Sequence, residues 1–193
     1  MVRHATCAHI DDTLLGRTLD APLDRRGLRQ ACALAERLRD ESPVRVESSP
    51  RRRTLQTARA IAADARCDVD LEPTLDELDF GDWSGRTFEQ LQSESSWRQW
   101  NRDRDAARTP AGVDIHAVQR SIALHFAALA AAFAGATLVL VTHAEIIRSA
   151  VLHCLRAPAS DYARVAIDPA SITCFTSGAD GLRVETVNEV VAP

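Results

Sequence analysis

The chain has 193 residues, of which 46% are hydrophobic and 26% are charged. These proportions are typical of a folded globular domain and exclude a largely disordered chain. The formal net charge of -4 argues against nucleic acid and acidic membrane surfaces as partners. All 23 basic residues are arginine, so chemistry that needs a lysine amine is excluded and arginine is the only fixed cation for binding anions.

The cysteines are odd in number and scattered, and no two of them form a C-x-x-C pair. They are Cys7, Cys32, Cys67, Cys154 and Cys174. This pattern predicts neither a disulfide framework nor a zinc site, and it favours a reducing, cytoplasmic location. The N-terminus shows no basic region followed by an apolar run, so we predict no signal peptide.

The first predicted strand ends at Arg3 and His4, in the segment MVRHAT. Only two residues precede Arg3, so either this strand is a stub or the natural chain begins upstream. The next predicted element is a helix over residues 24–41, because its apolar residues recur at helical spacing and Asp24 can serve as N-cap.

The chain then returns to a strand and a second helix. VRVESS (44–49) alternates like a short strand. Ser49 and Pro50 predict the start of a helix that runs to about residue 63, because serine caps helices and proline suits a first turn. DVDLEP (68–73) predicts a weaker strand.

A polar segment follows. ELDFGDWSG (77–85) predicts a loop with two glycines. Two short helices are expected after it, in TFEQLQSE and in residues 97–104.

The stretch from Ser121 to Ala144 has no formally charged residue and is long enough to span a bilayer. Its pattern favours a different interpretation. Apolar residues recur at steps of three and four up to Phe133, as in an amphipathic helix, and the β-branched segment TLVLVT follows Gly135. We therefore predict a helix, a turn and a buried strand here, and no membrane span.

A helix over residues 144–157 follows that strand, and strands in 165–177 and 181–190 are expected to pair. Strands that alternate with helices predict an α/β fold, a three-layer sandwich with a mostly parallel central sheet flanked by helices. Because we find no repeat or linker, we assign residues 1–193 to a single domain.

Polar side chains lie at the ends of two predicted strands. His4 follows the first strand, and His143 follows TLVLVT immediately before a helix. Because ligands bind beyond the carboxyl ends of the strands in open α/β sheets, we expect the two histidines to lie side by side. Arg51, Arg52 and Arg53 begin a helix, where clustered cations are unfavourable unless an anion binds nearby.

These residue types fit a phosphate site. Arginine makes bidentate, permanently charged contacts to phosphate oxygens, and neighbouring arginines keep a histidine neutral and nucleophilic. A carboxylic acid beside the phosphate has its pKa raised by the anion and can protonate a leaving oxygen. The sequence shows no metal-ligand spacing.

Four segments together resemble the histidine phosphatase superfamily, also called the phosphoglycerate mutase-like family. They are VRHAT, SSPRRRTLQTA, ELDFGDWSG and VTHAEIIR, which resemble in turn the family's Arg-His-Gly signature, its Ser-Ser-x-x-x-Arg-Ala-x-Gln-Thr-Ala segment, its Glu-x-x-x-Gly-x-Trp-x-Gly loop and its Thr-His-Gly-x-x-Ile-Arg segment. All four occur in family order. In its compactness the chain resembles the family's small phosphatases and α-ribazole phosphatases.

The resemblance implies a role for each matching residue. His4 would be the nucleophile that forms a phosphohistidine. Arg3, Arg53 and His143 would bind the phosphoryl oxygens, with Arg53 identified as the family arginine by the register of the QTA segment. Glu77 would protonate the leaving alkoxide and then activate the attacking water. Three aspartates surround Glu77, so a solvated acidic loop is the alternative interpretation of that segment.

Two more positions follow from the resemblance. Arg17, in LLGRTLDAPL, resembles the family's Gly-Arg loop and would contact substrate or phosphate. Ala144 stands where the family usually has glycine after the second histidine, and we include it among the phosphate-binding residues. The other histidines belong to no motif and are interpreted as structural, and Arg51 and Arg52 as surface charge or a rim that steers anions.

The predicted function is a cytoplasmic phosphatase that hydrolyses a small-molecule phosphomonoester through a phosphohistidine. The resemblance implies no metal and no organic cofactor. A phosphoglycerate mutase and a non-catalytic phosphate-binding or regulatory protein are the alternatives. Binding alone requires neither a nucleophile nor an acid, so the presence of both His4 and Glu77 favours catalysis. The expected partner is the phosphate ester, with no nucleic acid and no membrane, and a homodimer is left open.

Overall fold

The central sheet has the strand order β3-β2-β4-β1-β5-β6 in the computed structural model, which describes residues 1–178 and 181–192. Four strands are parallel, namely β1 (Val2–Arg3), β2 (Arg45–Ser48), β3 (Val69–Leu71) and β4 (Leu138–Thr142). β5 (Ser171–Gly178) runs antiparallel to β1 and pairs with β6 (Gly181–Val190) at one edge. The prediction of a mostly parallel sheet is confirmed.

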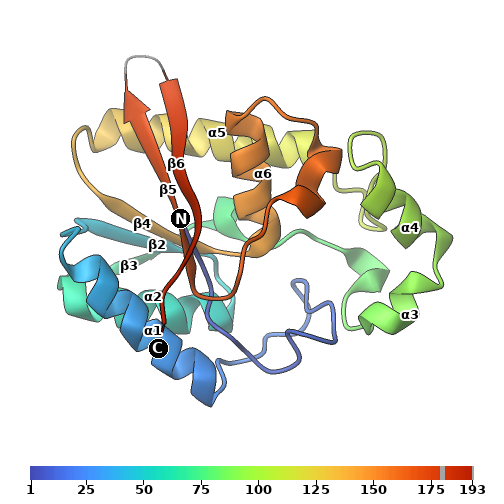
Figure 1. Cartoon of the computed structure of the whole chain (residues 1–193), viewed down its shortest axis with the longest axis horizontal. Coiled ribbons are helices and arrows are strands. Elements are labelled where there is room, and N and C mark those ends of the chain that lie inside the picture. The colour runs from blue at the N-terminus through green and yellow to red at the C-terminus, as the bar shows by residue number, and fades with distance from the viewer. Residues whose placement is uncertain (179–180, 193) are drawn as a thin grey trace.

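Helices cover both faces of this sheet, as Figure 1 shows. One face carries α1 (Arg25–Arg39) and α2 (Arg52–Ala65), and the other carries α5 (Ile115–Ala132) and α6 (Ala144–Cys154). Successive residues of β4 point to opposite faces, as strand geometry requires. Val139 and Val141 join the buried cluster with α1 and α2, whereas Leu140 joins the cluster with α5 and α6. This arrangement is the predicted three-layer sandwich.

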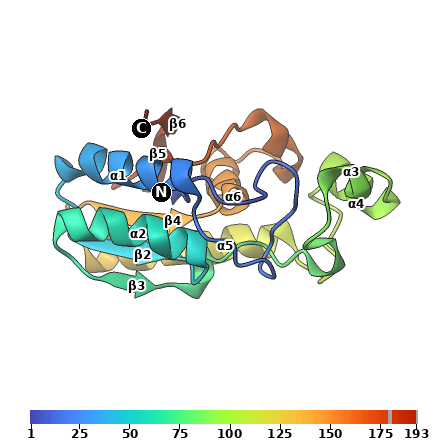
Figure 2. The same cartoon turned by 90° about the horizontal axis from the view of Figure 1, so that it is seen from below.

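A small helical lobe lies at one end of the molecule, away from the sheet (Figure 2). It contains α3 (Phe88–Gln92) and α4 (Ser95–Arg102). Three short 3-10 turns occur in the connections, η1 (Pro73–Leu75), η2 (Gly81–Trp83) and η3 (Ala159–Arg164). Trp83 packs edge-on against Trp97 with ring centroids 5.2 Å apart, which fixes α4 on the loop that contains η2.

β1 is only two residues long, but it lies in the middle of the sheet. Val2 pairs with Val141 of β4 and with Ile172 of β5, and its side chain is fully buried. The backbone N–H of His4 continues the pairing by donating to the carbonyl of Thr142 at 2.9 Å. Neighbours on both sides therefore fix the position of the residues that follow this short strand.

The start of α2 differs from the prediction. The helix begins at Arg52 with Arg51 as its N-cap, so the prediction that Ser49 caps this helix was wrong. The physical reason is competition for the hydroxyl, which is hydrogen-bonded to His143 at 2.8 Å and to Asp76 at 3.1 Å and accepts the backbone N–H of Arg51 only at 3.4 Å.

Other boundaries are close to the predicted ones. Asp24 caps α1 as predicted, since its carboxylate accepts from the backbone N–H of Gly27 at 2.7 Å. The strand expected over residues 165–177 begins only at Ser171, after a turn at residues 169–170. The uncharged stretch forms α5, a turn and β4, and no helix in the described part of the chain has the length and hydropathy to cross a membrane.

Candidate active site

The two histidines that were predicted to meet lie side by side at the carboxyl ends of β1 and β4. These strands are parallel neighbours with Arg3 paired to Thr142, so the next residue of each emerges at the same edge. The ring centroids of His4 and His143 are 5.3 Å apart, and both side chains are buried.

Arg53 joins the two imidazoles from the first turn of α2. Its Nε lies 3.3 Å from Nε2 of His4, and its Nη2 lies 3.2 Å from Nδ1 of His143. The guanidinium also donates to the carbonyls of Gly16 at 2.9 Å and Leu19 at 3.3 Å. These four contacts hold one cation between both histidines, and a guanidinium held in this way can bind a phosphate oxygen.

One ring nitrogen of His4, Nε2, carries no proton. Its Nδ1 lies 2.9 Å from the carbonyl oxygen of Ala5, which can only accept, so Nδ1 carries the proton and Nε2 keeps its lone pair. Burial, followed by the charges of Arg53 and Arg3, lowers the pKa of His4 well below its usual value. The ring is therefore neutral near physiological pH, and Nε2 can act as a nucleophile.

Glu77 is a largely buried carboxyl beside the histidines. Its Oε2 lies 3.7 Å from Nδ1 of His143, and its Oε1 accepts the backbone N–H of Leu78 at 3.0 Å. Burial raises the pKa of Glu77 to about 7, although the guanidinium of Arg53 opposes the rise. Asp76 is buried as well, so the alternative of a solvated acidic loop is excluded for this part of the segment.

A cavity of about 560 Å³ opens at this edge of the sheet. Its lining includes Arg3, His4, Arg53, Glu77 and Ala144. Arg3 donates through Nη1 to the carbonyl of Ile167 at 2.7 Å, and its buried Nε has no hydrogen-bond partner among the described residues. Ala144 is the first residue of α6, and a helix N-terminus favours a bound anion.

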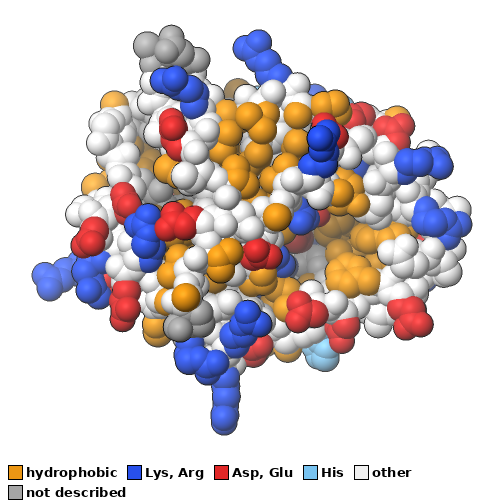
Figure 3. Space-filling view, in the orientation of Figure 1, with side chains coloured by type: hydrophobic (Ala, Val, Ile, Leu, Met, Phe, Trp, Pro, Cys, Tyr) orange, Lys and Arg blue, Asp and Glu red, His pale blue; other side chains and the backbone are white. Residues whose placement is uncertain are grey.

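The outer part of the cavity lies between α6 and the lobe of α3 and α4, and Figure 3 shows the hollow on this face. Aromatic side chains line it, namely Phe80, Phe88, Trp97 and Tyr162. Arg98 and Arg102, both on α4, also border the cavity and are exposed. Within the described ranges neither guanidinium pairs with a carboxylate, so both remain available to an anionic ligand.

Glu145 neutralises two other arginines of the cavity wall. Arg104 donates through Nη1 to its Oε2, and Arg148 donates through Nη1 to its Oε1 at 2.9 Å. Burial alone would raise the pKa of Glu145, but the two guanidinium groups lower it, so the carboxylate stays ionised. The sequence analysis gave none of these three residues a role, although Arg148 ends the VTHAEIIR motif.

A further network that the sequence pattern did not indicate lies behind His143. Oγ of Ser49 is 2.8 Å from Nε2 of His143 and donates to Oδ1 of Asp76 at 3.1 Å. Arg51 binds Asp76 twice, through Nε to Oδ1 at 2.8 Å and through Nη2 to Oδ2 at 2.7 Å. The interpretation of Arg51 as free surface charge or a steering rim was therefore wrong, because its guanidinium is paired with a buried aspartate.

Arg17 is not among the residues that line the cavity in the described structure. Its Nε donates to the carbonyl of Glu77 and lies 3.5 Å from Oδ2 of Asp76. It therefore supports the backbone that carries the acid, and a contact with substrate or phosphate stays a prediction.

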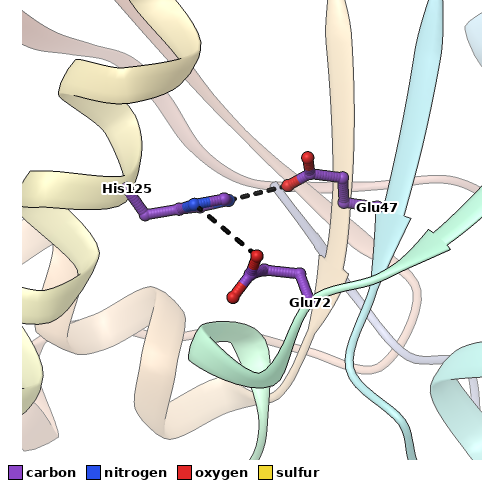
Figure 4. Close-up of side chains that lie close together, drawn as sticks. All are labelled: Glu47, Glu72 and His125. Atoms are coloured by element: carbon purple, nitrogen blue, oxygen red, sulfur yellow. Dashed lines mark hydrogen bonds and ion pairs between the residues drawn. The ribbon is translucent and has the colours of Figure 1, made fainter.

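His125 was interpreted as structural and has defined partners outside the cavity (Figure 4). Its Nε2 lies 2.7 Å from Oε2 of Glu47, and its Nδ1 lies 3.9 Å from Oε2 of Glu72. Ligand atoms of these three side chains lie within 4.8 Å of one another, a spacing that could hold a metal ion. The ion pairs of Glu47 with His125 and Arg45 satisfy these charges without one.

Comparison with known proteins agrees with this geometry. The family model for the histidine phosphatase superfamily (branch 1) matches residues 1–190. The structure of phosphoserine phosphatase from Entamoeba histolytica in complex with 3-phosphoglyceric acid has a TM-score of 0.88 and 25% identity, covering 97% of this chain and 94% of that chain. Glucosyl-3-phosphoglycerate phosphatase from Mycobacterium tuberculosis is 28% identical over 176 residues, or 84% of this chain and 77% of that protein.

A protein described as probable phosphoglycerate mutase GpmB, from Proteus mirabilis, is 42% identical over 81 residues. This match covers 42% of the chain and 38% of that relative, so the chain spans less than half of the relative's length. The family match, in contrast, extends over nearly the whole chain and includes all four motifs and the residues that line the inner cavity. The chain belongs to the histidine phosphatase superfamily (branch 1).

Proposed function

We propose that the protein is a metal-independent phosphatase that hydrolyses a small-molecule phosphomonoester through a phosphohistidine on His4. One observation carries this proposal. The same cavity contains a neutral His4, whose Nε2 carries a lone pair and no proton, and a carboxyl, Glu77, whose pKa burial raises to about 7. Phosphoryl transfer in two steps needs a nucleophile and a proton donor, whereas phosphate binding alone needs neither.

In the first step the lone pair of His4 Nε2 attacks phosphorus, and the bond from phosphorus to the ester oxygen breaks. The carboxyl proton of Glu77 passes to the departing oxygen, so the leaving group is a neutral alcohol. Arg3 and Arg53 border the same cavity and neutralise the phosphoryl oxygens. Charge stabilisation of this kind supplies most of the catalysis in phosphoryl transfer.

In the second step water attacks the phosphorus of the phosphohistidine. The phosphorus–nitrogen bond breaks, and its electron pair returns to Nε2 of His4. Glu77, now a carboxylate, takes the proton from the attacking water. Inorganic phosphate leaves, and both side chains regain their starting protonation states.

The outer cavity supports a substrate that has a second negative charge beyond its phosphate. Arg98 and Arg102 border it without carboxylate partners among the described residues, beside the aromatic wall. Similar proteins are described as acting on phosphoserine and glucosyl-3-phosphoglycerate, and one binds 3-phosphoglyceric acid. Each of these compounds is a phosphate ester that also carries a carboxylate. We therefore propose carboxylated phosphate esters as the substrate class.

Phosphate release measured with a chelator present tests the proposal, with phosphoserine, 3-phosphoglycerate and an aryl phosphate as substrates. We expect turnover that resists the chelator, that His4→Ala abolishes and that the exposed-residue control His9→Ala leaves intact. Arg102→Gln should raise KM for the carboxylated esters and leave the aryl phosphate unaffected. Turnover that the chelator removes, or equal turnover in wild type and His4→Ala, contradicts the proposal.

Phosphoglycerate mutase is the second candidate, because the relative with 42% identity is described as a probable mutase. A mutase passes the phosphoryl group of its phosphohistidine to a second alcohol before water attacks. Phosphorus NMR of a reaction that contains 3-phosphoglycerate and 2,3-bisphosphoglycerate separates the two. Accumulation of 2-phosphoglycerate without inorganic phosphate identifies a mutase, and accumulation of inorganic phosphate identifies a phosphatase.

Two sequence-based expectations, a cytoplasmic location and independence from metals and organic cofactors, stay predictions, and a third question, whether the chain forms a homodimer, stays open. Chelator resistance tests the second of them. Sedimentation of the purified chain tests the third.

A further inference from the structure

One carboxylate oxygen connects Glu77, the proton donor of the proposed mechanism, with His143 through Ser49. Oδ1 of Asp76 accepts the backbone N–H of Glu77 at 2.9 Å and the hydroxyl of Ser49 at 3.1 Å. Ser49 in turn lies 2.8 Å from Nε2 of His143. Asp76 therefore fixes both the backbone that carries Glu77 and the Nε2 edge of the His143 ring, which is fully buried and is not among the residues that line the cavity.

The partners of His143 determine which ring nitrogen carries the proton. Nδ1 faces Nη2 of Arg53, and because a guanidinium only donates, this contact is a hydrogen bond only while Nδ1 keeps its lone pair. In the neutral ring Nε2 then carries the proton and donates it to Oγ of Ser49. The hydroxyl proton of Ser49 goes to Asp76, because a carboxylate only accepts. The donors therefore run in one direction, from His143 through Ser49 to Asp76.

Asp76 is itself fixed in place. Two hydrogen bonds from Arg51 bind both of its oxygens, and Nε of Arg17 lies 3.5 Å from Oδ2. Asp76 is 7% exposed and Ser49 is fully buried, so water cannot replace a lost partner without a rearrangement. A buried donor or acceptor left without a partner costs roughly 1–3 kcal/mol, which keeps this order of donors in place.

When a phosphoryl group binds, Nδ1 has to change from a hydrogen-bond acceptor to a hydrogen-bond donor. Phosphoryl oxygens are acceptors, so a lone pair on Nδ1 would repel them, and a proton there would bind them. The charged and titratable groups around His143 are His4, Arg3, Arg51, Arg53, Asp76 and Glu77. Burial and the arginines lower the pKa of His143 well below its usual value in the free protein, and an anionic ligand opposes that effect.

We propose that Asp76 is a positioning residue that acts through Ser49. It keeps Nε2–H of His143 hydrogen-bonded to Ser49, so that the proton taken up when phosphate binds goes to Nδ1. That proton comes from solvent, and Nδ1–H then donates to a phosphoryl oxygen. The inference rests on the proposed binding of a phosphoryl group in this cavity. It assigns Ser49 and Asp76 an effect on catalysis although neither side chain lines the cavity.

Nitrogen-15 NMR of histidine-labelled protein reports the protonated nitrogen directly, with His143 assigned from a His143→Gln spectrum. In the free wild type we expect the proton on Nε2, and with inorganic phosphate we expect both nitrogens to be protonated. Ser49→Ala should give mixed tautomers, and Ser49→Thr, which keeps a hydroxyl, should restore the wild-type pattern. Ser48→Ala is the matched control, because this buried neighbour donates to a backbone carbonyl instead.

Kinetics supply the second measurement. Ser49→Ala and Asp76→Asn should lower kcat by about 10-fold or more with a smaller change in KM, since a misdirected tautomer weakens transition-state contacts. A proton on Nδ1 in the free wild type, or an unchanged tautomer and kcat in Ser49→Ala, overturns the inference. If the wild type hydrolyses no ester, the proposed function fails, while the NMR spectra still decide the role of Ser49 and Asp76.

Discussion

Oε2 of Glu77 lies 3.7 Å from Nδ1 of His143, and the two side chains are 13% and 0% exposed. Burial raises the pKa of Glu77 to about 7, so the carboxyl loses its proton within the neutral range. The first step of the proposed mechanism uses the protonated form, and the pH dependence of kcat/KM reports the pKa values of the free enzyme. We therefore expect kcat/KM for an alkyl phosphate to fall as pH rises through about 7. His4, whose pKa is lowered, stays neutral over this range and adds no opposing change.

Glu77→Gln should remove this alkaline fall, because glutamine keeps the shape of the side chain and has no proton to lose. Its loss of rate should depend on the leaving group. For an alkyl phosphate we expect a loss on the order of 10²–10⁴-fold, typical of general acid catalysis, and a smaller loss for nitrophenyl phosphate, whose leaving group needs no proton. Asp82→Asn, an exposed change in the same loop, is the control. Equal losses for both esters would show that Glu77 does not protonate the leaving group.

Arg53→Lys tests whether one guanidinium must reach both histidines. Lysine keeps the charge but cannot donate to His4 and His143 at once while also reaching the carbonyls of Gly16 and Leu19. We expect kcat to fall by about 100-fold or more, as for the loss of one donor to a developing anion, and inhibition by phosphate to weaken. Arg52→Lys, on the exposed side of the same turn, should retain wild-type kinetics. Equal kinetics in both variants would show that the guanidinium of Arg53 does not contribute to catalysis.

The sequence predicts the inner part of this site because strand ends obey simple rules. His4 and His143 each follow a strand, and β1 and β4 are parallel neighbours, so the two residues meet at one edge. In these cases a local pattern places the backbone, and the backbone places the side chain. Arg53, in contrast, is identified by the resemblance of SSPRRRTLQTA to the family segment, in which QTA fixes the register.

The contacts behind His143 and in the cavity wall could not be predicted in this way, because they depend on the paths of loops that have no periodicity. Ser49 is separated by 27 residues from Asp76 and by 94 from His143. Arg104 and Glu145 are 41 residues apart. The error at Ser49 has the same origin, since a hydroxyl at a helix start can cap the helix or bind a distant partner, and only the tertiary structure decides.

Gly27→Ala tests how closely α1 approaches the segment that follows His4. A Cβ atom at Gly27 would lie 1.9 Å from the carbonyl oxygen of Thr6, so the backbone of one segment must move. Alanine normally stabilises a helix by about 1 kcal/mol relative to glycine. Here we expect a lower free energy of unfolding, by about 1–3 kcal/mol as for an overpacked core, together with reduced kcat.

Urea denaturation and assays of phosphate release measure both effects of this substitution. Gly178→Ala is the control, because no heavy atom of the described residues, its chain neighbours apart, lies within 4 Å of the Cβ position there. A Gly27→Ala protein as stable as the wild type would show that α1 can shift away from Thr6 at no cost.

His125 should contribute stability that depends on pH. Its hydrogen bond to Glu47 outweighs burial and raises the pKa of His125 above its usual value. Burial would raise the pKa of Glu47, but His125 and Arg45 lower it overall. The imidazolium therefore stabilises the folded state fully below the unfolded-state pKa of histidine, and this contribution is lost as pH rises through the higher folded-state pKa. The carboxylate of Glu47 contributes above the unfolded-state pKa of glutamate, and its contribution is lost as pH falls through the lower folded-state value.

His125→Asn should therefore be less stable than the wild type, and the difference should shrink as pH rises from the unfolded-state pKa of histidine through the higher folded-state pKa of His125, where the imidazolium disappears. A charge-assisted hydrogen bond of this kind contributes roughly 1.5–3 kcal/mol. Urea unfolding at several pH values measures the difference in free energy of unfolding between the two proteins. The titration of His4 and His143 is common to both proteins and cancels in this difference. His153→Asn, at an exposed position near the end of α6, is the matched control. A difference that grows with pH would mean that His125 is buried in its neutral form and that the ion pair with Glu47 does not form.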